Sequence, residues 1–193
     1  MEATNLAELY QTPLIDWSRI AVRLDQGLSQ APETGGPNRH TCWLATVNDD
    51  GSPHITGIGA LWVDGAFWFE TGRSTRKAKN LARDPRCTMS VATDEFDLVV
   101  DGEARMVTER PTVAAMAERW AAGGWPARVD DTGMALTAEF SAPSAGPPPW
   151  FVYQLTPHTA TALLTVGPGG ATRWRFEPVP PDAEGGVEET STL

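Results

Sequence analysis

The sequence predicts an α+β fold, with an antiparallel, barrel-like sheet of about six to seven strands and short peripheral helices. Two observations lead to this fold class. From residue 41 onward, apolar residues alternate with a period of two over several runs, and turn signals separate these runs. The helical patterns are short, and they lack the regular strand-helix alternation that a parallel sheet requires.

The length of 193 residues suits one domain with a substantial core and is short for two. We expect a helical extension in residues 1–40 and the strand-rich domain in residues 41–176. Residues 177–193 contain five acidic and no basic side chains among proline, glycine and serine. This composition predicts a disordered acidic tail.

The formal net charge of −10 and the pI of about 4.7 argue against binding to polyanionic partners. Nucleic acid and anionic membranes both favour broad basic surfaces, so neither is expected to bind non-specifically. No run approaches the roughly 20 apolar residues of a membrane span, and the N-terminus lacks a signal-peptide pattern. Cys42 and Cys87 lie in apolar, strand-like runs, where we expect small buried hydrophobic residues. We expect a soluble, cytoplasmic protein.

The first half of the chain predicts helices followed by a meander. Residues 1–40 have a helical apolar spacing that Pro13 interrupts, which predicts one or two short helices before the loop "QAPETGGPN". Residues 41–71 predict three strands, joined by "NDDGSP" and by Asp64-Gly65, a dipeptide typical of type I′ hairpins. A short helix is expected over residues 75–83, before Asp84 and Pro85.

The second half predicts strands around one longer helix. "RCTMSVATD" and "FDLVVDGEARMVTE" are typical of strands. The helix after Pro111 carries Met116 and Trp120 on one face and ends at Gly123 or Gly124. The proline-rich "APSAGPPPW" predicts an extended loop. Two further strands, "WFVYQLTP" and "ATALLTV", are expected before "GPGG" leads into "ATRWRF".

The segment "TGRSTRKAKNL" concentrates cations where a strand passes into a helix. If Ser74 or Thr75 caps this helix, its first turn contains Arg76 and Lys77, where the helix dipole favours acidic side chains. These cations interact unfavourably with the helix dipole. If an anion is bound at the helix N-terminus, their presence there becomes favourable. Backbone N–H groups, hydroxyls and cations together suit a phosphate monoester. A solvated basic helix face is the alternative.

Two glycines in the preceding strand suggest which kind of ligand would carry this phosphate. Gly57 and Gly59 lie two residues apart in an otherwise apolar run, which predicts either a bulge or the close approach of a flat ligand. With Trp68 and Thr71 opposite them in the hairpin, a flat face would lead to the basic segment. An aromatic cofactor with a phosphate tail fits such a face.

Other classes of site find no support in the sequence. The three histidines do not have metal-ligand spacing, and no serine-hydrolase elbow or nucleotide-binding loop occurs. We therefore expect neither a metal site nor hydrolase chemistry.

The run "WLATVNDDGSPHITGIGALWVDGAFWFETGRSTRKAKNLARDP" resembles the pyridoxamine 5′-phosphate oxidase-like family of flavin and deazaflavin oxidoreductases. The resemblance covers residues 40–110 well and the closing segments more loosely. Its most specific element is "TGRSTRKAKNL", which is similar to the family's phosphate motif Thr-x-x-x-Ser/Thr-Arg-Lys-Ala. The resemblance implies an FMN-binding split barrel and hydride transfer between the cofactor and a small organic substrate. Because the reactive atoms of this family belong to the cofactor, the resemblance also implies that no catalytic acid-base residue is needed. The composition resembles the actinobacterial branch, in which many members use coenzyme F-420 in place of FMN.

The resemblance also implies roles for individual residues. Four positions match those that hold the cofactor phosphate in the family: Thr71, Thr75, Arg76 and Lys77. Three positions match the strand that lines the isoalloxazine ring: Thr56, Gly57 and Ile58. Arg73 and Lys79 are candidates to bind the longer acidic tail of coenzyme F-420.

The family binds its cofactor at a homodimer interface, which implies a homodimer here. Trp125 is the tip of a candidate lid, "GGWPARVDD", and is a candidate to contact the substrate. From their positions in the chain, three further residues are candidates to contact the substrate or to complete the partner's pocket: Trp150, Arg173 and Trp174. "GGATRWRF" lacks the histidine of the substrate motif of pyridoxamine 5′-phosphate oxidase itself, so vitamin B6 oxidation is not expected. A non-catalytic flavin or haem carrier, or a cofactor-free dimerisation domain, stays open as the alternative.

Overall fold

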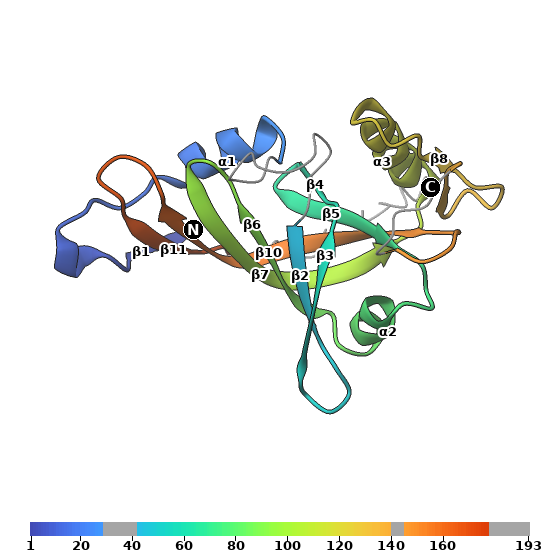
Figure 1. Ribbon diagram of the computed structural model, residues 1–193, viewed down its shortest axis with the longest axis horizontal. Coiled ribbons are helices and arrows are strands. Elements are labelled where there is room, and N and C mark those ends of the chain that lie inside the picture. Colours follow the sequence, from blue (N-terminus) through green and yellow to red (C-terminus); the bar gives the residue numbers. More distant parts are fainter. Residues whose placement is uncertain (29–41, 140–144, 178–193) are drawn as a thin grey trace, which may run out of the picture.

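The alternating apolar residues form one nine-stranded antiparallel sheet, with short helices around it (Figure 1). The computed structural model describes residues 1–28, 42–139 and 145–177. The helices are α1 (Trp17–Asp25), α2 (Arg76–Arg83), α3 (Arg110–Ala122) and the 3-10 turn η1 (Glu8–Tyr10). The strands are β1 (Glu2–Asn5), β2 (Cys42–Val47), β3 (Pro53–Ile58), β4 (Leu61–Val63), β5 (Ala66–Thr71), β6 (Arg86–Ala92), β7 (Phe96–Val107), β8 (Arg128–Val129), β9 (Leu136–Thr137), β10 (Phe151–Leu164) and β11 (Ala171–Arg175). The predicted α+β class is confirmed.

Strand β10 is where the sheet divides. The strand order is β1-β11-β10-β7-β6-β2-β3, and β5, with β4 beside it, also pairs with β10. One edge of β10 follows β7, while the other edge pairs first with β5 and then with β11. The register shifts between Pro157 and Thr159, so a β-bulge separates these two partners. The two strands predicted for this region are one strand, because the bulge bends the chain without ending the ladder.

The predicted three-stranded meander proves to be four strands. Asp64 and Gly65 both have positive φ, which confirms the expected type I′ turn between β4 and β5. The chain leaves the ladder at Gly59, so β3 pairs with β2 while β4 pairs with β5. Gly57 therefore lies opposite Trp43. The expectation that Trp68 and Thr71 lie opposite the glycines is wrong.

The N-terminal segment contains one helix as predicted and a strand that was not predicted. Strand β1 pairs with β11. Because β1 and β4 were not expected, the sheet has nine strands where about six to seven were predicted. Helix α1 begins at the N-cap Asp16 and buries Ile20 and Leu24. Trp17 packs edge-on against Trp62 and Trp174. The predicted loop at residues 30–38 and the tail from residue 178 lie outside the described residues.

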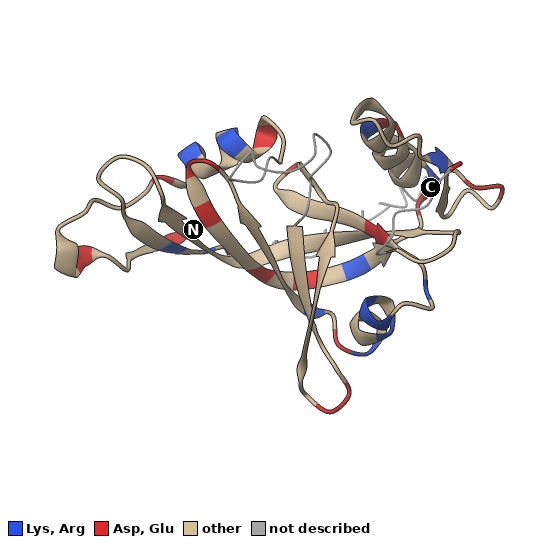
Figure 2. Cartoon of the chain, in the orientation of Figure 1, with Lys and Arg blue, Asp and Glu red and all other residues tan. Residues whose placement is uncertain are grey.

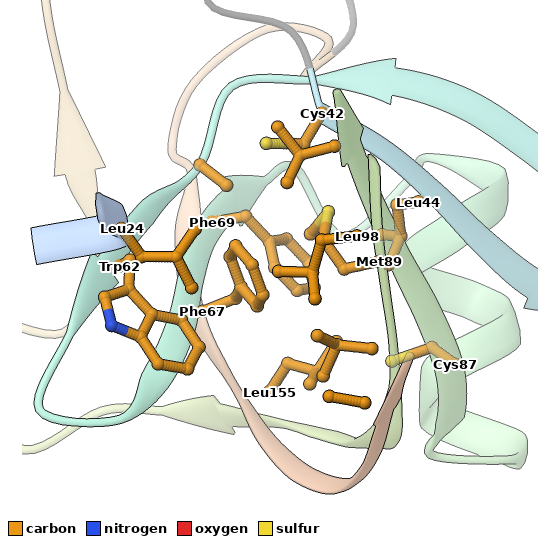
Figure 3. Close-up of a cluster of buried hydrophobic side chains, with 14 of the residues drawn as sticks. Leu24, Cys42, Leu44, Trp62, Phe67, Phe69, Cys87, Met89, Leu98 and Leu155 are labelled. Atoms are coloured by element: carbon orange, nitrogen blue, oxygen red, sulfur yellow. The ribbon is translucent and has the colours of Figure 1, made fainter. Parts of the chain in front are cut away.

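Two hydrophobic clusters enclose β5. The first core, inside the curved sheet, contains Phe67 and Phe69 together with residues of β2, β6, β7 and β10 (Figure 3). The second core lies under α3 and contains Trp68. Every residue of β5 is consequently buried. Cys42 and Cys87 belong to the first core, which confirms them as small buried residues, and burial raises the pKa of each thiol to about 12.

The described helices are short, and the charged side chains are unevenly distributed. In the described ranges, no helix is both long and apolar enough to cross a bilayer. Acidic side chains are spread over the strands and loops, and basic side chains form a cluster on α2, with others on α1, β7 and α3 (Figure 2).

Gly102 provides a test of the sheet at the bulge. A Cβ atom on Gly102 would lie 2.1 Å from the carbonyl oxygen of Thr156 on β10. We expect Gly102→Ala to lower the free energy of unfolding by about 1–3 kcal/mol, because β7 and β10 must separate. Gly123→Ala is the matched control: its Cβ would make only ordinary contacts, so stability should be unchanged or slightly higher. Equal denaturation midpoints for the two variants would contradict this close approach.

Candidate functional site

The segment from Thr71 to Lys77, here called the basic turn, joins β5 to α2. Thr75 has an extended backbone, and its hydroxyl accepts a hydrogen bond from the N–H of Ala78 at 3.3 Å, so Thr75 is the N-cap. The same hydroxyl donates to the carbonyl of Gly72 at 2.9 Å. Since this uses its proton, the contact of 2.9 Å between the Thr71 and Thr75 hydroxyls has Thr71 as the donor. The turn is thus tied to the end of β5 by side chains.

The charge of the turn is the reverse of what a helix N-terminus favours. The first turn of α2 contains no acidic residue, and Arg76 and Lys77 occupy its first two positions. Figure 2 shows the resulting basic helix beside the β2–β3 hairpin. Arg73, Arg76 and Lys79 are exposed, whereas Lys77 is buried. An anion near the exposed side would interact favourably with both the helix dipole and the cations.

A proline-rich loop packs beneath the turn. The N–H of Gly72 donates to the carbonyl of Ala145 at 2.9 Å, and a Cβ on Gly72 would come equally close to that oxygen. The indole N–H of Trp150 donates to the carbonyl of Gly146 at 2.8 Å. Trp150 is fully buried and presents no surface to a substrate. Its observed role is to hold the loop that supports the turn.

Helix α2 is anchored to the neighbouring hairpin. The Asn80 amide donates to the Thr46 hydroxyl at 3.0 Å and to the Asn48 side-chain oxygen at 3.1 Å. The guanidinium of Arg83 donates to the carbonyl of Val47. These contacts fix the direction of α2, so the basic turn is held at both ends.

Arg73 lies over aromatic side chains of β10. Its guanidinium carbon is 4.0 Å from the centre of the Phe151 ring, a cation–π geometry. Burial raises the pKa of Tyr153, and the charge of Arg73 opposes this shift. Arg73, within the basic turn, is therefore held against β10 and is still exposed to solvent.

Glu70 is a residue that sequence analysis missed. It is buried on β5, directly before the turn, and burial raises its pKa to about 8 against the opposing effect of Lys77. Burial lowers the pKa of Lys77, and Glu70 opposes that shift. The available signal was a single acid in the otherwise apolar run "AFWFET".

The residues predicted to line the cofactor ring lie on a strand that does not pair with β5, the strand that leads into the basic turn. Thr56, Gly57 and Ile58 lie on β3, the terminal strand of the sheet, and their partners are on β2. Ile58 is buried in the first core, and Thr56 and Gly57 are half-buried. Backbone groups on the outer edge of β3 thus have no strand partner in the described part of the chain.

The remaining predicted substrate residues are dispersed. Trp125 is half-buried and packs against Trp120 and Trp150, so the tip of the expected lid points into the second core. Trp174 is buried in the first core, 5.2 Å from the Trp17 ring. Arg173 is exposed on β11. Trp150 and Trp174 are covered by other residues of the described chain, and the expected ligand contacts of the four residues stay predictions.

A separate hollow of about 460 Å³ opens on the sheet near the β10 bulge. Its polar lining includes Arg86, Asp101 and His158. Arg86 is engaged with Asp84, and Asp101 accepts hydrogen bonds from two threonines. Within the described ranges, no group of three metal-ligating side chains occurs. The basic turn is thus the best-organised binding feature.

A family model described as pyridoxamine 5′-phosphate oxidase matches residues 33–161. No curated protein sequence gives a significant match. The solved structure of General Stress Protein 26 from Bacillus anthracis str. Sterne is similar, with 15% identity, a TM-score of 0.51, and coverage of 84% of this chain and 100% of that one. A pyridoxamine 5′-phosphate oxidase-related, FMN binding protein from Nostoc punctiforme PCC 73102 has 17% identity, a TM-score of 0.51, and coverage of 86% and 100%. At such identities, the similarity concerns the fold.

The N-cap can be tested by substitution. We expect Thr75→Ala to lower the free energy of unfolding by about 1 kcal/mol, because the Ala78 N–H and the Thr71 hydroxyl lose their acceptor. Thr75→Ser should retain most of the stability, and Ser74→Ala, at the exposed neighbour, should change little. Urea denaturation measures all three. A loss of stability in Ser74→Ala that matches the loss in Thr75→Ala would show that the cap is assigned to the wrong residue.

Proposed function

The chain belongs to the pyridoxamine 5′-phosphate oxidase family, and from this premise we propose that it is a flavin- or deazaflavin-dependent oxidoreductase. The observation that carries the proposal is the basic turn, where a hydroxyl-capped helix N-terminus has cations and no acid in its first turn. We propose that the turn binds the phosphate of the cofactor. The cofactor ring supplies the hydride chemistry, and the residues of the chain bind and orient it.

The donor set of the turn fits a phosphate group. The N-cap satisfies the N–H of Ala78, and the first N–H groups of any helix lack intrahelical acceptors and can point at a bound anion. Arg76 is exposed and can offer a fork of donors to phosphate oxygens. Thr71 is buried and acts through Thr75, whose position it fixes. Lys77 contributes its charge from within the protein.

The choice between FMN and coenzyme F-420 depends on what lies beyond the phosphate. Arg73 and Lys79 are exposed on either side of Arg76 and extend the positive surface. Coenzyme F-420 carries a longer acidic tail than FMN, and these two cations suit it. We propose coenzyme F-420 as the cofactor, with FMN as the other candidate.

We propose that the cofactor ring lies along β3. A flavin or deazaflavin ring presents hydrogen-bonding groups at its pyrimidine edge, and the free edge of a terminal strand offers matching N–H and C=O groups. Gly57 lacks a side chain that would keep a flat ring away. Thr56 and Ile58 flank it on the same strand. The ring site therefore uses backbone groups more than side chains.

We propose a homodimer, supported by the outer face of the sheet. One row of cross-strand partners runs across this face: Gly57, Trp43, Ser90, Val99, Thr161 and Arg173. Trp43 and Val99 are exposed, as is Ile55 nearby, so this face presents large apolar side chains among polar ones. A two-fold axis near the middle of the row would bring the Arg173 end of one copy to the Gly57 end of the other. This geometry supports a role for Arg173 in the partner's pocket.

The phosphate site is tested by charge reversal. Arg76→Glu should weaken the binding of FMN or coenzyme F-420 by about one to two orders of magnitude, because a charge-assisted hydrogen bond worth about 1.5–3 kcal/mol is lost. Lys77→Ala should act in the same direction. Fluorescence or absorbance titration with each cofactor gives the dissociation constants.

The control for this charge reversal is Arg119→Glu, the same change at an exposed site on α3. It should leave both dissociation constants unchanged. If Arg76→Glu binds both cofactors as tightly as Arg119→Glu does, the phosphate site is not at the basic turn. Turnover with a panel of substrates distinguishes the enzyme from a carrier, because a carrier leaves reduced cofactor unoxidised.

The dimer face has its own test. We expect Trp43→Arg to convert the dimer to a monomer in sedimentation experiments and to weaken cofactor binding, because the partner completes the pocket. Leu9→Arg changes an even more exposed apolar residue outside the row and should leave the dimer intact. A wild-type protein that sediments as a monomer at micromolar concentration, or a dimer that survives Trp43→Arg, contradicts the proposed face.

A further inference from the structure

The exposed cations of the basic turn and of α2 have no carboxylate partner in the part of the chain that the structure describes. Arg73, Arg76 and Lys79 are exposed, and none of the ion pairs among the described residues includes them. Hydrogen bonds from Ser52 lower the pKa of Asp50, at the β2–β3 turn, and the charge of Arg76 adds a smaller effect. The surface of the turn is therefore open to an acidic partner.

A segment of opposite charge follows the last described residue. Residues 178–193, here called the acidic segment, contain Asp182, Glu184, Glu188 and Glu189 and no basic side chain. Attraction between exposed charges extends over about 8–10 Å at an ionic strength of 0.10–0.15 M. The acidic segment is thus complementary in charge to the basic turn.

Strand β11 directs the chain towards the basic turn. It runs antiparallel to β10, and at its end the N–H of Phe176 donates to the carbonyl of His158 at 2.9 Å. Because the two strands are antiparallel, the chain leaves β11 in the direction of the first residue of β10. That residue, Phe151, lies opposite Thr71, and its ring centre is 4.0 Å from the guanidinium carbon of Arg73.

The length of the acidic segment suits this path. The seven steps along β10 between these two contacts cover about 24 Å, at about 3.4 Å per residue. Glu188 lies 11 residues after Glu177, and a chain of that length spans at most about 36–40 Å when extended. Asp182 lies five residues after Glu177 and reaches at most about 18 Å. Glu188 and its neighbour Glu189 are thus the acids that can reach the turn with length to spare.

We propose that Glu188 and Glu189 bind to the basic turn of the same copy of the chain, where they compete with any anionic ligand of the turn. Their carboxylates pair with the exposed cations of the turn and of α2. The displaced acids remain tethered nearby, so the segment acts as a competitor at a high local concentration. The contact itself is independent of the proposed function, whereas its effect on cofactor affinity rests on that function.

Cross-linking tests the contact, because Lys77 and Lys79 are the only lysines of the chain and Lys79 is the exposed one. A carbodiimide joins an amine to a carboxylate in direct contact with it and adds no spacer. In the cofactor-free wild-type protein at low salt, mass spectrometry should find Lys79 joined to Glu188 or Glu189. In about 1 M salt, where the Debye length is about 3 Å, this product should be lost.

A mixture of ¹⁵N-labelled and unlabelled protein shows which copy supplies the acids. Each cross-linked pair of peptides should carry a single isotope, because both peptides come from one chain. Absence of the Lys79 product, or pairs that combine the two isotopes, overturns the proposal.

Cofactor affinity tests the competition. The full-length double variant Glu188→Gln/Glu189→Gln should bind FMN or coenzyme F-420 about two- to tenfold more tightly than the wild type at low salt, the range expected when two exposed ion pairs are lost. The gain should vanish near 1 M salt. Asp25→Asn/Glu118→Gln removes the same net charge from exposed positions on α1 and α3 and should leave both dissociation constants unchanged.

The two proposals fail in different ways. If the wild type binds a cofactor and the Glu188→Gln/Glu189→Gln variant gains no more affinity than the control, the competition is overturned and the proposed function stands. If the cross-link to Lys79 forms and neither cofactor binds to any of the variants, the contact is supported and the proposed function is contradicted.

Discussion

The fixed end of β5 is the constraint on which the candidate site depends. The strand lies between two hydrophobic cores, and its last residue, Thr71, is tied by its hydroxyl to the N-cap of α2. Hydrogen bonds to β2 and its turn hold the helix from the other side. A turn with so many fixed atoms can keep cations at a helix N-terminus, where an isolated helix would be destabilised. The core packing thus provides the preorganisation that an anion site needs.

Electrostatics and packing act together at this site. Exposed Arg73, Arg76 and Lys79 give the surface its charge, and Lys77 adds a buried charge that water screens little. The cation–π contact of Arg73 and the anchoring of α2 limit the freedom of these groups. Trp150, expected at a pocket, instead supports the loop beneath Gly72. The aromatic residues thus hold Arg73 and the loop beneath the turn in place.

Local signals in the sequence predicted the local features of the structure. The Asp64-Gly65 turn, a helix cap at Ser74 or Thr75, and the α3 helix depend on residues within a few positions of one another, and all three were predictable. The structure assigns the cap to Thr75. The single β10 strand and the separation of β3 from β5 depend on pairing between distant segments, which periodicity does not specify. The burial of Glu70 also depends on the second core, which covers a face of β5 that the sequence pattern leaves undetermined.

The central claim is that the basic turn recognises a phosphate group. Its most direct test compares the affinity of each cofactor with that of the same ring system lacking the phosphate: FMN against riboflavin, and coenzyme F-420 against its deazaflavin ring with the ribityl chain alone. For the cofactor that binds, the phosphorylated form should bind at least about tenfold more tightly, in keeping with one or more charge-assisted hydrogen bonds. Arg76→Glu should reduce this ratio towards one. Equal affinities of the wild-type protein for both forms would contradict the claim.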